Sequence, residues 1–182
     1  MHTNGLEAEA APRGADVTAL FKEHHGFVFR VLLHLGVADA DRADALQEVF
    51  IVVHRRAHEY RDQDKPRAWL YAIAARVAHD YRRRAYRRRE NVTDAPPEPT
   101  QPPPQGAELA TREAVALAQR LLGALPPKQL AVFLLFEVEQ MPMPEVATAV
   151  GCPLATAHAR LRLARSRVLA LVSRARLRGD VP

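Results

Sequence analysis

Five side chains able to form hydrogen bonds follow a Gly-Cys-Pro sequence in the last third of the chain. They are Thr156, His158, Arg160, Arg162 and Arg165. Guanidinium, imidazole and hydroxyl groups can bind base-pair edges and phosphate oxygens. The cluster therefore predicts recognition of nucleic acid.

The residues around this cluster predict a helix-turn-helix that would position it. A short helix can begin at Pro142 or Pro144, Gly151 can leave that helix with positive φ, and Pro153 can open a second helix. The second helix has an apolar stripe formed by Leu154, Ala157, Leu161, Ala164, Val168 and Leu171. A helix that is apolar on one side and carries donors on the other fits a major groove. An amphipathic helix with a solvated basic face is the alternative.

A second cluster combines aromatic and cationic side chains after a polar break at residues 61–65. Pro66 can open a helix there, with Trp69, Ile73, Val77 and Tyr81 along its buried edge. Aromatic rings among guanidinium groups can stack on unpaired bases and follow phosphates. Taken alone, Trp69 fits a core position better than a base-stacking one. The arginine run at residues 82–89 repels itself, which favours a solvated end or a polyanion beside it.

Charge and composition indicate the class of partner. The 182 residues carry a formal net charge of +5, with arginines concentrated at residues 82–89 and 160–178. A local positive field favours an anionic polymer or a membrane surface as partner. The sequence shows no signal peptide and no apolar run of membrane-spanning length, so we expect a cytoplasmic protein without membrane insertion.

Other kinds of chemistry find little support in the sequence. His54 and His58 are spaced four apart, as in helical zinc sites, but Arg55 and Arg56 lie beside them and no carboxylate lies between them. Cys152, the single cysteine, fits a small buried side chain in the turn. No pairing of nucleophile and base, and no glycine-rich phosphate loop, is evident. We therefore expect no metal, no cofactor and no enzymatic activity.

The hydrophobic periodicity predicts an all-α protein of two small domains. Helices are expected at residues 17–35, 38–60, 66–83, 108–122 and 127–138, ahead of the helix-turn-helix. The expected organisation is a disordered segment at 1–15, a domain at 16–90, a flexible linker at 91–106, a second domain at 107–175 and a basic tail at 176–182. The linker contains six prolines, and in polyproline II form it would span roughly 50 Å, so it could hold two modules on separated sites.

With both halves considered together, the chain resembles the extracytoplasmic-function (ECF) sigma factors of bacterial RNA polymerase over about residues 17–175. Asp44, Gln47, Glu48 and Phe50 match the D-x-x-Q-E-x-F segment of that family. Further matches are Arg67-Ala-Trp69-Leu70, Ile73-Ala74, Asp80 before the arginines, Leu125-Pro126, and Gly151-Cys152-Pro153-Leu154-Ala155-Thr156. The order and spacing of these segments carry the resemblance.

The resemblance implies a non-enzymatic promoter-specificity subunit, with region two at 16–90 and region four at 107–175. Binding of core polymerase would fall to Asp44, Gln47, Glu48 and Arg55. Binding and melting of the −10 element would fall to Arg61, Lys65, Arg67, Trp69, Arg76, His79, Arg82 and Arg83. Recognition of the −35 element would fall to Thr156, His158, Arg160, Arg162 and Arg165.

The implied partners are promoter DNA, core RNA polymerase through its largest-subunit clamp and its flap, and an anti-sigma factor that could hold the protein at the membrane. The chain departs from the family pattern at His158, Ala159 and Leu163, and at Ala75 and Arg76, which affects the expected promoter sequence. Two other hypotheses remain at this stage. One is a stand-alone helix-turn-helix repressor or activator, and the other is an arginine-rich RNA-binding protein.

Overall fold

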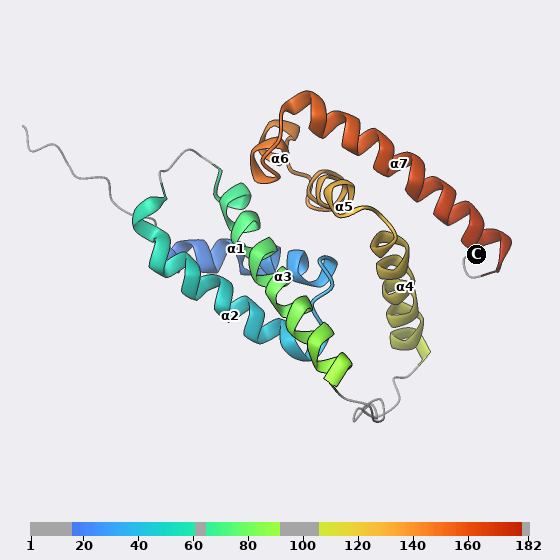
Figure 1. The fold of residues 1–182 in the computed structure, drawn as a ribbon, viewed down its shortest axis with the longest axis horizontal. Coiled ribbons are helices and arrows are strands. Elements are labelled where there is room, and N and C mark those ends of the chain that lie inside the picture. The colour runs from blue at the N-terminus through green and yellow to red at the C-terminus, as the bar shows by residue number, and fades with distance from the viewer. Residues whose placement is uncertain (1–15, 61–64, 92–105, 180–182) are drawn as a thin grey trace, which may run out of the picture.

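The computed structural model describes residues 16–60, 65–91 and 106–179, and every regular element within these ranges is helical (Figure 1). The all-α prediction is confirmed. The expected disordered segment at 1–15, Arg61, nearly all of the expected linker and the last three residues of the tail lie outside the described residues.

Three helices form the N-terminal half: α1 (Val17–His34), α2 (Asp39–Arg56) and α3 (Pro66–Asn91), with a short 3-10 turn, η1 (Ala57–Glu59), after α2. Asp16 caps α1, its carboxylate accepting hydrogen bonds from the backbone N–H of Thr18 at 2.9 Å and of Ala19 at 3.2 Å. The buried residues recur at steps of three and four, which packs one stripe of each helix inward. Val28, Leu32, Val49, Val53 and Leu70 are completely buried there.

Helix α3 continues eight residues past its expected end at Arg83. Two arginines of the run pair with carboxylates of α2, Arg84 with Glu48 at 3.6 Å and Arg88 with Asp41 at 3.3 Å. Because these pairs relieve the mutual repulsion of the arginines, and arginine and alanine favour helix, the run stays helical up to Asn91.

The C-terminal half contains α4 (Gly106–Gly123), α5 (Pro127–Phe133), a π-helical turn η2 (Leu134–Val138), α6 (Met143–Ala149) and α7 (Leu154–Leu177). The apolar stretch at 127–138 was expected to be one continuous core helix. Instead it divides into α5 and η2, because its end closes through wider hydrogen bonds such as Glu139 N–H to Leu134 C=O at 2.9 Å.

The predicted helix-turn-helix is present as α6 and α7. Gly151 adopts φ 62°, its N–H donates to Thr148 C=O, and the N–H of Cys152 donates to Ala147 C=O at 3.0 Å. This is a Schellman ending, which requires a left-handed residue after the helix. Cys152 is half-buried rather than fully buried. Pro153 then caps α7.

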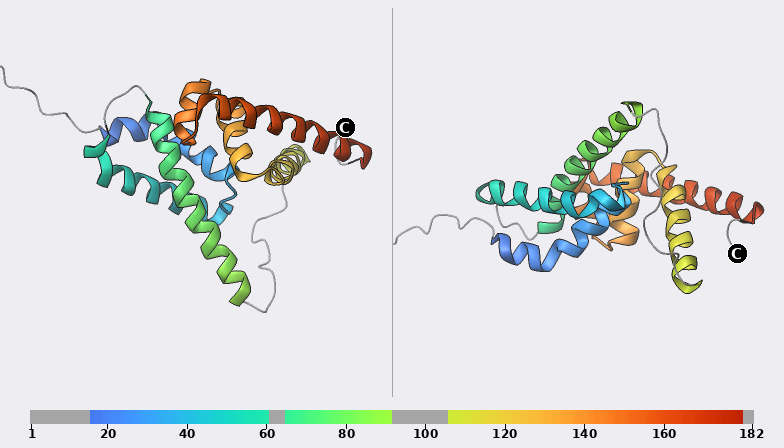
Figure 2. Two further views of the ribbon diagram at one scale, coloured as in Figure 1. Left: turned by 45° about the horizontal axis from the view of Figure 1, so that its top comes forward. Right: turned by 90° about the horizontal axis from the view of Figure 1, so that it is seen from below.

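The two halves pack against each other, an arrangement that the expectation of tethered, separated modules does not anticipate. One buried cluster includes Leu70 and Tyr71 of α3 together with Met143 and Val146 of α6. Helix α6 contacts both α3 and α7, and the C-terminal end of α7 extends away from α1, α2 and α3 in all three views (Figures 1 and 2).

Candidate nucleic-acid and polymerase interfaces

The outer face of α7 carries the donors predicted to bind DNA. His158, Arg162 and Arg165 are spaced four and three apart, so they share a face, and all three are exposed. Thr156 and Arg160 lie roughly 160° around the helix from His158 and Arg162, on the other side of the buried stripe, and are half-buried. Ala157, Leu161 and Ala164 are buried behind them, as predicted. Leu154 differs from prediction, being 46% exposed, because the first residue of α7 lies ahead of the packed part of the stripe.

Arg165 is held by neighbours in its own half of the chain. Its Nε donates to Glu137 Oε1 at 2.6 Å, and its guanidinium lies over the Phe136 ring at 5.7 Å. Arg167, two residues on, donates to Gln129 at 2.8 Å. These contacts fix α7 against the segment formed by α5 and η2. Within the described part of the chain His158 and Arg162 are exposed and make no polar side-chain contact, so these two side chains can turn toward a ligand.

A stripe along α3 brings together most of the residues predicted to bind the −10 element. The stripe contains Lys65, Trp69, Arg76, His79 and Arg83. Each residue lies one or two helical turns after the one before it, so all five share one face. Lys65 and Trp69 are half-buried, whereas the other three are exposed. The stripe therefore presents one aromatic ring followed by a row of cationic groups.

Trp69 is half-buried, packing against the main apolar cluster on one side and bordering a shallow hollow on the other. Its ring packs against Tyr60, with 4.8 Å between centroids and an interplanar angle of 39°. Lys65, Ala72 and Thr148 also line the hollow, so α6 contributes to one wall. An aromatic pair at an open hollow beside cations can stack on an unpaired base. The sequence favoured a core position for Trp69, and the half-buried ring both packs against the core cluster and borders the hollow.

Arg67 and Arg82 lie apart from this stripe. Both are on the side of α3 that faces other parts of the chain, at helical positions far around from Trp69. Arg67 donates to the backbone C=O of Glu139 at 2.7 Å and lies over the Phe27 ring at 4.6 Å. Arg82 borders a cavity beside Gly36 and Gln119. The eight residues grouped by sequence therefore do not form one surface.

Helix α2 presents the residues predicted to bind polymerase. Asp44, Gln47 and Arg55 are exposed, whereas Glu48 is half-buried and pairs with Arg84. Gln47 and Arg55 border an apolar groove between α1 and α2. The groove also contains Phe21 and Ile51, which are 44% and 43% exposed. An apolar centre with a polar rim is typical of a protein interface.

Sequence reasoning missed Arg30 and Glu139. Glu139 is buried although charged, and its carboxylate binds Arg30 of α1 and Arg67 of α3. Nothing in the local sequence marks it, because a glutamate at the end of an apolar helix normally lies in water. A contact spanning more than a hundred residues cannot be inferred from periodicity.

Two histidines of α1 lie near these groups. Burial lowers the pKa of His34 below its ordinary value of 6.5, an effect strengthened by Arg30 and opposed by Glu139. Burial also lowers the pKa of His24, with Arg67 strengthening the effect and Glu23 opposing it. Each ring therefore binds its proton more weakly in the folded chain than in the unfolded chain.

We expect the free energy of unfolding to be highest above about pH 6.5 and to fall as the pH drops below it, because the unfolded chain then binds more protons than the folded chain. His34→Gln should reduce this dependence. Urea denaturation at a series of pH values from about 8 to about 5, roughly the range over which histidine titrates, measures this pH dependence of the free energy of unfolding. His58→Gln, at a side chain that is 77% exposed, is the control. An identical pH dependence in His34→Gln and the parent would contradict the prediction.

Within the described ranges no helix is long and apolar enough to cross a bilayer. The described residues also contain no group of three or more His, Cys, Asp or Glu side chains placed to hold a metal ion. His54 and His58 are both exposed, on α2 and η1.

Comparisons with solved structures identify the fold. A structure of CnrH in complex with the cytosolic domain of CnrY has a TM-score of 0.66 and 22% identity, covering 86% of this chain and 87% of that one. The sigma factor RpoE from Bartonella quintana, in complex with the anti-sigma factor NepR, has a TM-score of 0.65 and 16% identity, covering 87% of this chain and 97% of that one.

Sequence comparisons give the family. The sigma-70 region 2 model matches residues 20–88 and the sigma-70 region 4 model matches residues 116–168, together more than half of the chain. The ECF RNA polymerase sigma factor SigM of Mycobacterium tuberculosis is 29% identical over 153 residues, which are 84% of this chain and 75% of that protein. SigE of Mycolicibacterium smegmatis is 28% identical over 154 residues, 82% of this chain and 58% of that protein. The chain belongs to the ECF sigma factors, which are non-enzymatic factors that initiate transcription with RNA polymerase.

Proposed function

We propose that this sigma factor directs core polymerase to promoters through three separate faces, one each on α2, α3 and α7. The observation that carries the proposal is the pair of donor-bearing stripes, one on α3 and one on α7, each backed by a buried apolar stripe. The assignment of domains follows, with residues 16–90 acting on polymerase and the −10 element and residues 107–175 acting on the −35 element.

The α2 face would bind the clamp of the largest polymerase subunit. Gln47 and Arg55 border the apolar groove and Asp44 is exposed on the same helix, so polar and apolar contacts are available together. Glu48 would contribute less freely, since it already pairs with Arg84. The flap of the polymerase is the proposed partner of the C-terminal half.

The α3 stripe would bind the melted −10 element. The hollow at Tyr60 and Trp69 supplies ring surface for a base taken out of the stack, and Arg76, His79 and Arg83 lie further along the helix to receive phosphates. Lys65 lies at the same hollow. Arg61 is included in the proposal by family resemblance alone.

The α7 face would enter the major groove of the −35 element. The first turns of a recognition helix contact base edges, and His158 and Arg162 are exposed there without a polar contact to the described part of the chain. Thr156 and Arg160 lie on another face of α7, and their proposed part in −35 recognition rests on the family resemblance. Arg165 would have to leave Glu137 in order to reach DNA.

We also propose an anti-sigma factor as a partner and the cytoplasm as the location. In the solved structures named above, the sigma factor RpoE is bound to the anti-sigma factor NepR, and CnrH is bound to the cytosolic domain of CnrY. The apolar groove on α2 offers a surface that such a partner could cover.

Run-off transcription with purified bacterial core polymerase tests the proposal. Discrete starts on genomic fragments that depend on the added protein would support it and would define both promoter elements. Absence of starts, together with tight binding of the protein alone to duplex DNA, would instead favour the stand-alone repressor or activator.

We expect the double substitution Asp44→Ala/Gln47→Ala to weaken binding to core polymerase roughly 30-fold or more, because truncating central interface residues costs about 1 kcal/mol or more each. Both side chains are exposed, so the fold should be kept. Fluorescence anisotropy of labelled protein against core polymerase measures the affinity. Gln119→Ala, at an exposed glutamine of α4, is the matched control. Unchanged affinity in the double variant would remove α2 from the polymerase interface.

A further inference from the structure

Glu139 lies at the junction between the two halves of the chain. Of the residues that the structure describes, it is the one charged residue that is buried, with its side chain 2% exposed. A carboxylate is costly to remove from water unless it is paired and hydrogen-bonded. Its partners therefore determine what it does.

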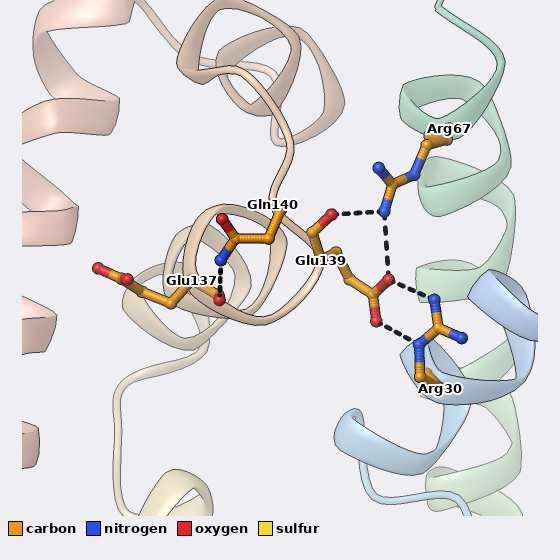
Figure 3. Close-up of polar contacts among 5 residues, drawn as sticks. All are labelled: Arg30, Arg67, Glu137, Glu139 and Gln140. Atoms are coloured by element: carbon orange, nitrogen blue, oxygen red, sulfur yellow. Dashed lines mark hydrogen bonds and ion pairs between the residues drawn. The ribbon is translucent and has the colours of Figure 1, made fainter.

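Both partners belong to the N-terminal half. Arg30 of α1 binds the carboxylate with two parallel bonds, Nε to Oε1 at 2.9 Å and Nη2 to Oε2 at 2.8 Å. Arg67 of α3 donates through Nη2 to Glu139 Oε2 at 3.2 Å and to its backbone C=O at 2.7 Å. Figure 3 shows Glu139 reaching across from the C-terminal half to the two arginines. One glutamate thus joins three segments that are remote in sequence.

The backbone around Glu139 is held firmly. Gln140 adopts φ 53°, a left-handed conformation that is uncommon for a residue other than glycine, and its side chain donates to Glu137 C=O at 2.5 Å. The N–H of Met141 donates to Leu135 C=O at 2.9 Å. Because this turn is fixed, the carboxylate is presented in one direction and loses little further entropy on binding the arginines.

Arg67 gives the contact a functional meaning. A guanidinium binds a carboxylate and a phosphate with the same geometry, so a bound glutamate excludes a phosphate from the same donors. Arg67 belongs to the helix proposed to bind the −10 element, yet its Nη2 donors are occupied by Glu139. The closed chain therefore places its own anion on a DNA-binding helix.

The closed arrangement is also incompatible with both promoter elements at once. Elements centred near −10 and −35 lie about 25 base pairs apart, roughly 85 Å of duplex at about 3.4 Å per pair. In the closed chain α6 contacts both α3 and α7, so the two DNA faces lie within a few helix diameters of about 10 Å each. The halves must separate before both elements are bound.

We propose that the Arg30–Glu139–Arg67 contact is an intramolecular latch that holds the free sigma factor closed and competes with DNA phosphate for Arg67. The competition rests on the proposed function of α3, whereas the closure does not. Opening frees Arg67 and allows α7 to move away from α3. The apolar contact between α3 and α6 supplies attraction, and the ion pairs set its register.

Removing the carboxylate should open the chain. Without the Glu139 charge, Arg30 and Arg67 lose the charge-assisted hydrogen bonds to the carboxylate that join the N-terminal half to the C-terminal half. The apolar contact and the bond from Arg67 to the Glu139 C=O must then hold the halves together. Glu139→Gln keeps the shape of the side chain and removes the charge. Glu137→Gln is the matched control, because Glu137 binds Arg165 within the C-terminal half at 2.6 Å and makes no polar contact with the described residues of the N-terminal half.

The test measures the distance between the halves in the full chain by double electron–electron resonance. Spin labels replace His58 in η1 and Leu177 at the end of α7, which are 77% and 88% exposed, with Cys152 changed to alanine in every sample. We expect Glu139→Gln to move most molecules to longer distances, and Glu137→Gln to keep the parent distribution. A parent-like distribution in Glu139→Gln, or equal widening in both variants, overturns the latch.

Arg30→Gln keeps the proposal testable if Glu139→Gln does not fold. It removes the bidentate partner, which is 52% exposed, and leaves Glu139 bound to Arg67. We expect it to widen the distance distribution less than Glu139→Gln does. No widening in a folded Arg30→Gln, as judged by circular dichroism, overturns the latch as well.

A second measurement tests the competition with DNA. Oligothymidylate binds through its phosphates and requires no promoter sequence, so Glu139→Gln should bind it roughly three- to tenfold more tightly than the parent does. If Glu139→Gln widens the distance between the halves but binds oligothymidylate no more tightly than the parent, the proposed competition between Glu139 and DNA phosphate is overturned. Failure of run-off transcription by the parent would reject the proposed promoter function without altering the distance result, which involves no DNA.

Discussion

Leu70→Ala is expected to lower the free energy of unfolding by about 2 to 5 kcal/mol. Leu70 is completely buried on α3, within the cluster that joins the N-terminal helices and α6. Truncation removes apolar contacts and leaves a cavity that the packed helices can fill only in part. Urea denaturation followed by circular dichroism measures the loss.

The matched control for Leu70→Ala is Leu169→Ala. Leu169 lies on α7 and is 68% exposed, so its truncation should change stability by no more than about 0.5 kcal/mol. Similar losses in the two variants would mean that Leu70 is not part of a tightly packed core.

Arg162→Ala is expected to lower transcription from −35-dependent promoters roughly 5- to 140-fold, the equivalent of about 1 to 3 kcal/mol for a bidentate base contact. Arg162 is exposed on the same face of α7 as His158, one helical turn away. Run-off transcription on templates with single changes in the −35 element measures both the loss and its position. A base contact should relax specificity at one base pair.

Arg178→Ala is the control for Arg162→Ala. Arg178 is also an exposed arginine, at the C-terminal cap of α7, about 24 Å along the helix axis. It should retain nearly full activity at low salt. A uniform loss across all templates in Arg162→Ala would show a phosphate contact in place of a base contact.

Local signals in the sequence were sufficient for much of the fold. Gly151 and Pro153 predicted the helix-turn-helix because positive φ and a proline at a helix start have strong local causes. The apolar stripe of Ala157, Leu161 and Ala164 was visible for the same reason, since burial follows helical periodicity. Residues whose roles depend on neighbours in the sequence were therefore placed well.

Features that depend on remote partners were not accessible from the sequence. Helix α3 continues past Arg83 because carboxylates of α2 receive its arginines, and the pairing of Asp41 with Arg88 spans 47 residues. In the sequence, Arg67 and Arg76 are both arginines of the same predicted helix and could not be distinguished. In the structure Arg67 binds Glu139, whereas Arg76 is exposed. The sequence favoured a core position for Trp69, because a tryptophan on an apolar stripe usually packs inward, but it did not indicate that the ring would also border a hollow.

The π-helical turn η2 sets the rotational phase of everything that follows it. Its hydrogen bonds span five residues instead of four, which amounts to one extra residue within the helix. Each residue turns an α-helix by about 100°. Deleting one residue from Leu134–Val138 would therefore rotate the Glu139 carboxylate about a quarter turn away from Arg30. The register between the two halves of this sigma factor thus depends on a single inserted residue. An insertion or deletion at this turn would therefore disturb the contact between the halves more than a substitution of one of its side chains would.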